Sequence, residues 1–171
     1  MNIVVIGSGA REHALTWKLL KDDTTGLRKV YTLPGNGGCP YPVPIRVDHF
    51  EKILEFCKKE SVDLVIVGPE QPLALGLADF LREHKIPTFG PGKEASRLES
   101  SKSFAKDFMK RHGVATADFW LASNTQEVRS IVENLQGSCV IKYDGLAAGK
   151  GVVVCKSIDE GRQAVDWLED S

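Results

Sequence analysis

Short apolar runs alternate with stretches of helical periodicity over the first 90 residues. Each run is continuous, as expected for a strand covered on both faces, and the runs comprise residues 2–6, 30–33 and 62–67. Helical spacing follows at residues 10–20, then from Asp48, with Glu51 in capping-box position, and then through Leu73, Leu77, Phe80 and Leu81. This order predicts βαβ units with right-handed crossovers and a mostly parallel sheet.

The pattern changes after Gly90-Pro91-Gly92. Helical patterns then occupy residues 101–112 and 124–135, and a last one begins at Ser157 with Glu160 in capping-box position. Between them, residues 139–142 and 152–155 read as strands that flank a loop rich in glycine and alanine. The second part of the chain is therefore expected to mix helices with a hairpin.

Composition narrows the class of protein. Hydrophobic residues make up 42% and charged residues 26%, with a net charge of −1, which is typical of a soluble globular protein. No basic run offers a footprint for nucleic acid, and no apolar stretch is long enough for a membrane span or a signal segment. Four cysteines lie far apart without CxxC spacing, which weakens zinc and redox interpretations and favours reduced thiols in a cytoplasmic protein.

Three polar, glycine-bearing loops follow the predicted strands, at residues 7–12, 34–38 and 68–70. Ligands of open parallel sheets bind beyond the carboxyl ends of the strands, so these loops locate a site. In Gly7-Ser8-Gly9-Ala10-Arg11-Glu12 the glycines would let the backbone approach a ligand, and the helix N-terminus favours an anion. NAD is disfavoured because Glu12 stands where a dinucleotide fingerprint has its third glycine.

The polar side chains of these loops could bind a ligand or could only stabilise the fold. Arg11 can fork onto a phosphate or form a solvated pair with a glutamate. Glu70 can accept hydrogen bonds from a ribose or an amine, or serve as a carboxylate at a helix N-terminus. His13 reads as a helix-surface or satisfied histidine rather than as a ligand.

The segment from Lys142 to Val152 carries the sharpest signal. It differs from a Walker A loop, because three residues rather than four separate Gly145 from Gly149, and Gly151 follows Lys150 where that loop has Ser or Thr. A small-residue loop between strands can instead cover phosphates with its amide N–H groups, while Lys142 directs a cation at them. The alternative is an ordinary hairpin loop with a solvated lysine.

Taken together, these segments resemble the glycinamide ribonucleotide synthetases (phosphoribosylamine–glycine ligases), which are ATP-grasp enzymes. The matching segments are residues 7–14, 34–36, 67–73, 98–104 and 144–152. The resemblance implies a Rossmann-like domain that precedes the ATP-grasp domain, at residues 1–100, followed by the first part of an α+β ATP-grasp domain, at residues 101–171. It also implies ATP-dependent ligation of glycine to 5-phosphoribosylamine in purine synthesis, through a glycyl phosphate, with ATP, glycine and 5-phosphoribosylamine as the small-molecule partners.

The resemblance carries over site residues by motif. On the ATP side these are Lys102, Lys142, Gly145, Leu146, Ala147, Ala148, Gly149, Lys150 and Gly151. On the phosphoribosylamine side they are Gly9, Arg11, Glu12, Gly35, Asn36, Gly68, Pro69 and Glu70.

Two departures from the family pattern stand out. Tyr143 occupies a position where a small residue is common, which would alter the packing of the loop. Members of the family are more than twice this length, so the Mg²⁺ ligands are expected beyond Ser171 and the chain alone is expected to be inactive. Two alternatives to this function remain. The chain could belong to a different ATP-grasp ligase or carboxylase, or it could be a non-catalytic module that binds a nucleotide or sugar phosphate.

Overall fold

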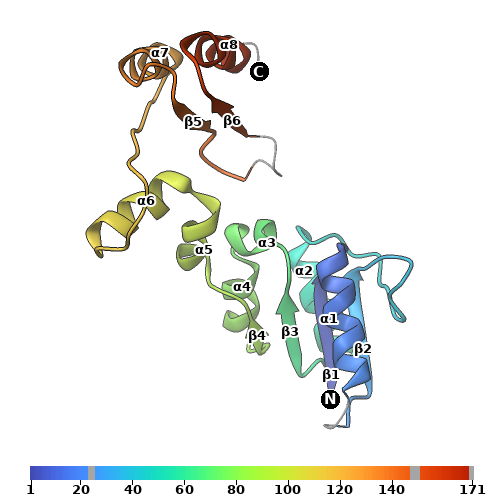
Figure 1. Cartoon of the computed structure of the whole chain (residues 1–171). Coiled ribbons are helices and arrows are strands. Elements are labelled where there is room, and N and C mark those ends of the chain that lie inside the picture. Colours follow the sequence, from blue (N-terminus) through green and yellow to red (C-terminus); the bar gives the residue numbers. More distant parts are fainter. Residues whose placement is uncertain (23–25, 147–150, 170–171) are drawn as a thin grey trace. The chain divides into compact units, whose positions relative to one another are not determined.

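The computed structural model describes residues 1–22, 26–146 and 151–169 of the chain (Figure 1). The chain divides into two compact units, Met1–Glu99 and Ser100–Ser171. Each unit has its own sheet.

The first unit is built on a four-stranded parallel sheet with strand order β2-β1-β3-β4. Its strands are β1 (Asn2–Gly7), β2 (Lys29–Pro34), β3 (Leu64–Val67) and β4 (Thr88–Phe89). The helices between and after them are α1 (Ala10–Lys21), α2 (Phe50–Lys59), α3 (Glu70–Leu75), α4 (Leu77–Glu83) and α5 (Lys93–Ser100). The predicted α/β alternation and parallel sheet are confirmed.

Strand β1 lies inside the sheet and sends successive side chains to opposite faces, as the two-residue period of a strand requires. Val4 and Ile6 join the larger core cluster, which packs α2, α3 and α4 against one face. Ile3 and Val5 belong to a smaller cluster on the other face, where Leu19 of α1 covers them. Burial on both faces explains why these strands are continuous apolar runs.

Two local predictions in the first unit were wrong. The capping box at Asp48 does not form: α2 begins at Phe50, and the Asp48 carboxylate accepts hydrogen bonds from Arg46 Nε at 3.0 Å and Nη2 at 2.7 Å. The two oxygens of Asp48 are thus bound to the guanidinium of Arg46 and not to a backbone N–H of α2. The helix expected through Leu73 and Leu81 is broken at Gly76, whose φ of 100° is left-handed and separates α3 from α4.

The second unit consists of α6 (Lys102–Arg111), α7 (Thr125–Asn134), the antiparallel hairpin of β5 (Cys139–Lys142) and β6 (Val152–Cys155), and α8 (Ile158–Glu169). The expected helix starts are confirmed, since Ser101 caps α6 and Asn124 caps α7, each accepting from the backbone N–H three residues on. Helices α7 and α8 lie side by side (Figure 1), and a Cβ on Gly161 of α8 would lie only 2.4 Å from Val132 of α7. Glycine thus permits their close approach.

The hairpin has one covered face and one open face. Cys155 is buried, as are Ala164 and Val165 of the neighbouring α8. The alternate positions Val140, Val152 and Val154 remain 48%, 46% and 61% exposed. Among the described residues, no helix combines the length and apolar character needed to span a membrane.

Candidate functional site

The three loops predicted to converge do meet, at the carboxyl ends of β1, β2 and β3. Gly35 N–H donates to the carbonyl of Gly7 at 3.0 Å, which joins the second loop to the first. Asn36 Nδ2 reinforces this link by donating to the carbonyl of Ser8 at 3.0 Å. Gly68 N–H donates to the carbonyl of Ile6 at 3.1 Å and brings in the third loop. We call residues 7–12, 34–38 and 68–70 the strand-end site.

Glu12 occupies the centre of the strand-end site and is only 3% exposed. Its Oε2 accepts a hydrogen bond from Gly9 N–H at 2.8 Å. A Cβ added to Gly7 or to Gly68 would lie 2.4 Å from an atom of the Glu12 side chain. Glycine at positions 7 and 68 therefore makes room for the Glu12 side chain.

An ion pair bridges the first and third loops. Arg11 Nη1 donates to Glu70 Oε1 at 2.9 Å, and Arg11 Nε lies 3.4 Å from Glu12 Oε1. The hydrogen bond from Arg11 lowers the pKa of the Glu70 carboxyl below its ordinary value. Arg11 is the first-turn cation expected from the sequence, and its pairing with two carboxylates offsets its unfavourable place at a helix N-terminus. The site thus combines an exposed guanidinium with ionised carboxylate oxygens, a set that suits phosphate, hydroxyl and amine groups.

Buried Glu12 Oε1 makes no hydrogen bond within the described part of the chain. Its 3.4 Å separation from Arg11 Nε satisfies an ion pair but not hydrogen-bond geometry, so the attraction is electrostatic only. Buried carboxylate oxygens normally have a donor, so Glu12 Oε1 has room for a hydrogen bond from a water, an ion or a ligand.

The remaining predicted residues of the strand-end site shape its loops. Asn36 Oδ1 accepts from Gly38 N–H at 2.9 Å, so the Asn36 amide is used at both ends to hold the second loop. Gly35 has a φ of 74°, a left-handed conformation that favours glycine. Pro69 precedes α3 in extended conformation and places Glu70 at its first position.

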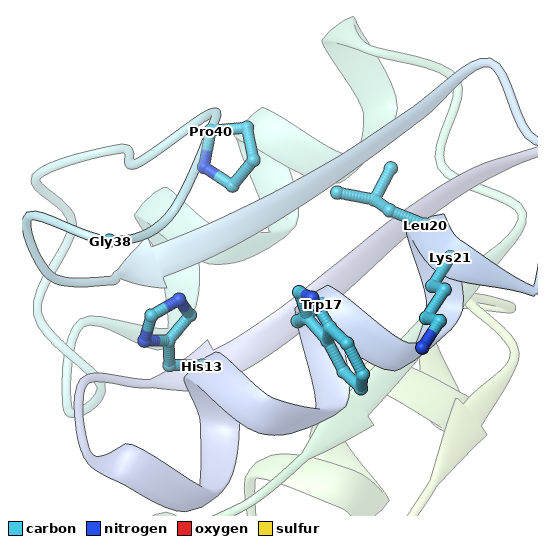
Figure 2. Close-up of a pocket in the computed structure, with 6 residues that line it drawn as sticks. All are labelled: His13, Trp17, Leu20, Lys21, Gly38 and Pro40. Carbon is cyan, nitrogen blue, oxygen red and sulfur yellow. The ribbon is translucent and has the colours of Figure 1, made fainter.

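His13 packs against the second loop rather than joining the charged cluster. A Cβ on Gly38 would lie 2.2 Å from His13 Cε1, so the imidazole rests on the bare backbone of that glycine. Figure 2 shows the pocket beside it, about 280 Å³ in volume and lined by His13, Trp17, Leu20, Lys21, Gly38 and Pro40. Neither Arg11 nor Glu70 lines this pocket, and we place the candidate chemistry at the strand-end site on the strength of its charged groups.

A second group of candidate residues lies at the end of the β5–β6 hairpin where the connecting loop begins. Lys142 is the last residue of β5, is exposed, and pairs with Val152 in the strand register. It therefore shares the open face with Val140 and Val154, two register positions away. Tyr143 N–H donates to the carbonyl of Gly151 at 2.8 Å and closes the last described rung before the loop. Of the predicted loop residues, Ala147, Ala148, Gly149 and Lys150 lie outside the described part.

Lys102 reaches the same loop from the start of α6. Its Nζ donates to the carbonyl of Gly145 at 2.8 Å, and its backbone N–H donates to Asp144 Oδ1 at 2.6 Å. Asp144 also accepts a hydrogen bond from Ser103 N–H at 3.2 Å. Burial alone would raise the pKa of Asp144, but the hydrogen bonds from Ser103 and Lys102 outweigh it and lower the pKa. We call Lys102, Lys142, Asp144 and Gly145 the hairpin site.

Sequence reasoning missed two functional relationships. Asp144 was not singled out, because no local pattern pairs it with Lys102, 42 positions away. The central place of Glu12 was also missed, although the capping-box spacing from Gly9 to Glu12 could have revealed its bond to the Gly9 amide. Among the described residues, no group of three or more His, Cys, Asp or Glu side chains is placed to hold a metal ion.

Comparison with known proteins identifies the family of both units. Residues 1–99 match the family model described as "Phosphoribosylglycinamide synthetase, N domain", and residues 100–170 match "Phosphoribosylglycinamide synthetase, ATP-grasp (A) domain". The phosphoribosylamine–glycine ligase of Rhizobium meliloti (strain 1021) is 43% identical over 169 residues, which are 97% of this chain and 40% of that protein. The trifunctional purine biosynthetic protein adenosine-3 of Drosophila pseudoobscura pseudoobscura is 44% identical and is matched over 98% of this chain and 13% of its own length.

A solved structure agrees with these sequence matches. The crystal structure of phosphoribosylamine–glycine ligase from Thermotoga maritima superposes with a TM-score of 0.71 at 32% identity, covering 97% of this chain and 38% of that one. The chain thus spans about 40% of the length of the single-function ligases that it matches.

Proposed function

The chain belongs to the phosphoribosylglycinamide synthetase family, and we propose from this membership that it carries the N-terminal part of an ATP-dependent ligase. The proposed reaction joins glycine to 5-phosphoribosylamine and yields glycinamide ribonucleotide, ADP and phosphate. The glycine carboxylate takes the γ-phosphoryl group of ATP, and ADP leaves. The amine then forms the C–N bond by attacking the acyl carbon, phosphate leaves, and the amine nitrogen loses a proton.

We assign the ATP phosphates to the hairpin site. Lys142 and Lys102 supply two ammonium groups at the start of the glycine-rich loop, where negative phosphate oxygens need neutralising. The exposed valines beside Lys142 offer an apolar surface suited to a flat base. Gly145, Leu146 and Gly151, with the loop residues between them, complete the proposed ATP-binding segment.

We assign 5-phosphoribosylamine to the strand-end site. Arg11 suits the 5-phosphate, because its planar guanidinium can fork onto phosphate oxygens. Glu70 and the unsatisfied Oε1 of Glu12 suit the hydroxyl and amine donors of the sugar. Gly9, Gly35, Asn36, Gly68 and Pro69 form the backbone frame that holds these side chains.

The two proposed ligands are thus assigned to different units of the chain, which suggests two domains. We propose that residues 1–100 form the Rossmann-like domain of the ligase and that residues 101–171 form the first part of its ATP-grasp domain. Mg²⁺ would neutralise phosphate charge in the complete enzyme. The four cysteines are free thiols, which supports a reducing compartment such as the cytoplasm.

The observation that carries the proposal is the bracketing of one loop by two lysines, Lys142 in β5 and Lys102 bonded to Gly145. Calorimetric titration of the chain with ATP tests it. We expect ATP to bind, and Lys142→Ala to weaken binding by about tenfold or more, since a charge-assisted contact contributes roughly 1.5–3 kcal/mol. Arg11→Ala is the matched control, because it removes a cation from the other unit.

Titration with ribose 5-phosphate separates the leading proposal from its alternatives. A truncated ligase should bind the sugar phosphate through Arg11 and bind ATP weakly through Lys142. Equal ATP affinity in the parent chain and Lys142→Ala would refute the hairpin assignment. ATP-dependent turnover of glycine by the purified 171-residue chain would refute the expectation that it is inactive alone.

A further inference from the structure

Asp144 makes the densest set of hydrogen bonds at the hairpin site. Its Oδ1 accepts from the backbone N–H groups of Lys102 at 2.6 Å and of Ser103 at 3.2 Å. Its Oδ2 accepts from the hydroxyl of Ser101 at 3.3 Å and from the hydroxyl of Ser103. The Asp144 carboxylate therefore lies at the N-terminus of the ten-residue helix α6, where the positive end of the helix dipole also stabilises it.

These bonds connect two parts of the chain that both contribute a cation. Asp144 lies two positions after Lys142, so its side chain reaches α6 from the segment that follows the strand bearing that lysine. Its bond to the Lys102 backbone holds the start of α6, and the Lys102 ammonium then reaches the carbonyl of Gly145 at 2.8 Å. Asp144 thus ties the segment that follows Lys142 to Lys102, the residue that carries the second ammonium group.

We propose that Asp144 is a positioning residue for ATP binding, which fixes Lys102 and the beginning of the glycine-rich loop so that both lysines face the same phosphates. This inference rests on the proposed function of the hairpin site. Asp144 itself does not contact the nucleotide, since its negative charge would repel phosphate. Its effect on affinity comes through geometry.

The opposing expectations from charge and from geometry make the proposal testable. Removing a negative charge beside a phosphate site should raise ATP affinity if charge alone matters. Removing the acceptor that holds Lys102 should lower ATP affinity if position matters. Asp144→Asn removes the charge but keeps a carbonyl acceptor for the Lys102 and Ser103 amides, whereas Asp144→Ala removes both.

The experiment compares ATP affinity in the 171-residue chain and its variants by NMR titration, which also reports weak binding. We expect Asp144→Ala to lose about tenfold in affinity and Asp144→Asn to stay within about threefold of the parent chain, because the carbonyl rescues most of the amide contacts. Asp107→Asn is the matched control: it removes a carboxylate from α6, the helix that Asp144 contacts, and should leave affinity unchanged because Asp107 pairs with Arg111 at 2.8 Å. Circular dichroism verifies that each variant is folded.

Amide hydrogen exchange provides the second measurement. The Lys102 and Ser103 amides should exchange at least about tenfold faster in Asp144→Ala, as expected when a protecting acceptor is lost. Unchanged exchange, or an ATP affinity for folded Asp144→Ala that equals or exceeds that of the parent, would overturn the proposal while leaving the ATP site intact. If Lys142→Ala and Lys102→Ala also bind ATP like the parent, or if the parent binds none, the proposed function of the hairpin site fails, and the role of Asp144 fails with it.

Discussion

Alanine at position 68 tests whether Glu12 fills the space between the ends of β1 and β3. A Cβ there would lie 2.4 Å from Glu12 Oε1 and 2.6 Å from its Cγ. Carbon atoms pack at about 3.5 Å or more, so the Glu12 side chain must move by roughly 0.9 Å, the difference between that contact and the 2.6 Å separation. The movement displaces the carboxylate from Gly9 N–H, its 2.8 Å partner.

The expected cost follows from these two effects. Overpacking of a filled site costs about 1–3 kcal/mol, and a lost charge-assisted hydrogen bond about 1.5–3 kcal/mol. The costs overlap because one movement of Glu12 relieves the clash by giving up the bond, and we therefore expect Gly68→Ala to lower the free energy of unfolding by about 2 kcal/mol. Urea unfolding followed by the fluorescence of Trp17, in a chain with Trp120 and Trp167 replaced by Phe, measures the first unit.

Two further variants make this prediction specific. Gly37→Ala is the control, because a Cβ at Gly37 meets no atom within 4 Å, and it should change stability by no more than about 0.5 kcal/mol. Glu12→Ala vacates the space, so adding Gly68→Ala to that background should cost less than about 0.5 kcal/mol. A Gly68→Ala chain as stable as the Gly37→Ala chain, or an undiminished cost in the Glu12→Ala background, would contradict the packing described for Glu12.

Three other outcomes are expected. Arg11→Ala should raise the pKa of Glu70 toward 4.5 in a carbon-13 NMR titration, because the hydrogen bond from Arg11 is the main cause that lowers it. The stability that this pair contributes is present above pH 4.5 and is lost as the pH falls through the lowered pKa of Glu70. Cys57 should resist iodoacetamide at pH 8 in the folded chain, as measured by mass spectrometry, because burial raises its pKa to about 11 and keeps the thiol protonated. Gly137→Ala should destabilise the second unit by more than about 3 kcal/mol in thermal unfolding, because the added Cβ would lie 2.0 Å from the carbonyl carbon of Ser157 and the φ of Gly137 is 78°. Gly113→Ala is the control: its φ of 65° is similar but the space around it is open, so it should cost about 1 kcal/mol.

Local patterns in the sequence were sufficient for most of the elements and for the meeting of the three glycine-bearing loops. Continuous apolar runs identified β1, β2 and β3, because a strand covered on both faces has no polar positions to interrupt it. The parallel order of these strands then required the loops that follow them to meet at one edge.

Other features depended on contacts that no local pattern records. The two-residue strand β4 is too short to show a period, and the break at Gly76 falls inside an uninterrupted helical pattern. Asp48 has the spacing of a helix cap, yet Arg46, two residues earlier, takes its carboxylate. Competition of this kind is decided by geometry after the chain has folded, so residue types and spacing leave it open.

The packing of Glu12 against Gly7 and Gly68 and the hydrogen bonds of Asp144 were likewise beyond the sequence. The motif around Gly9 indicates a ligand-binding loop, but only the structure reveals that Glu12 fills the space beside Gly7 and Gly68. Asp144 lies in a segment read for its glycines, while its partners are 41 and 42 positions away. Long-range acceptors of this kind set the positions of the charged groups that the motifs identify.

Mapping both ligands on the nitrogen-15-labelled chain by NMR tests the central claim most directly. ATP should shift the amide signals of residues 101–103, 140–146 and 151–154, and ribose 5-phosphate should shift those of residues 7–12, 35–38 and 68–70. Shifts by both ligands in the same unit, or by neither, would contradict the assignment of phosphates to the hairpin site and of the sugar phosphate to the strand-end site.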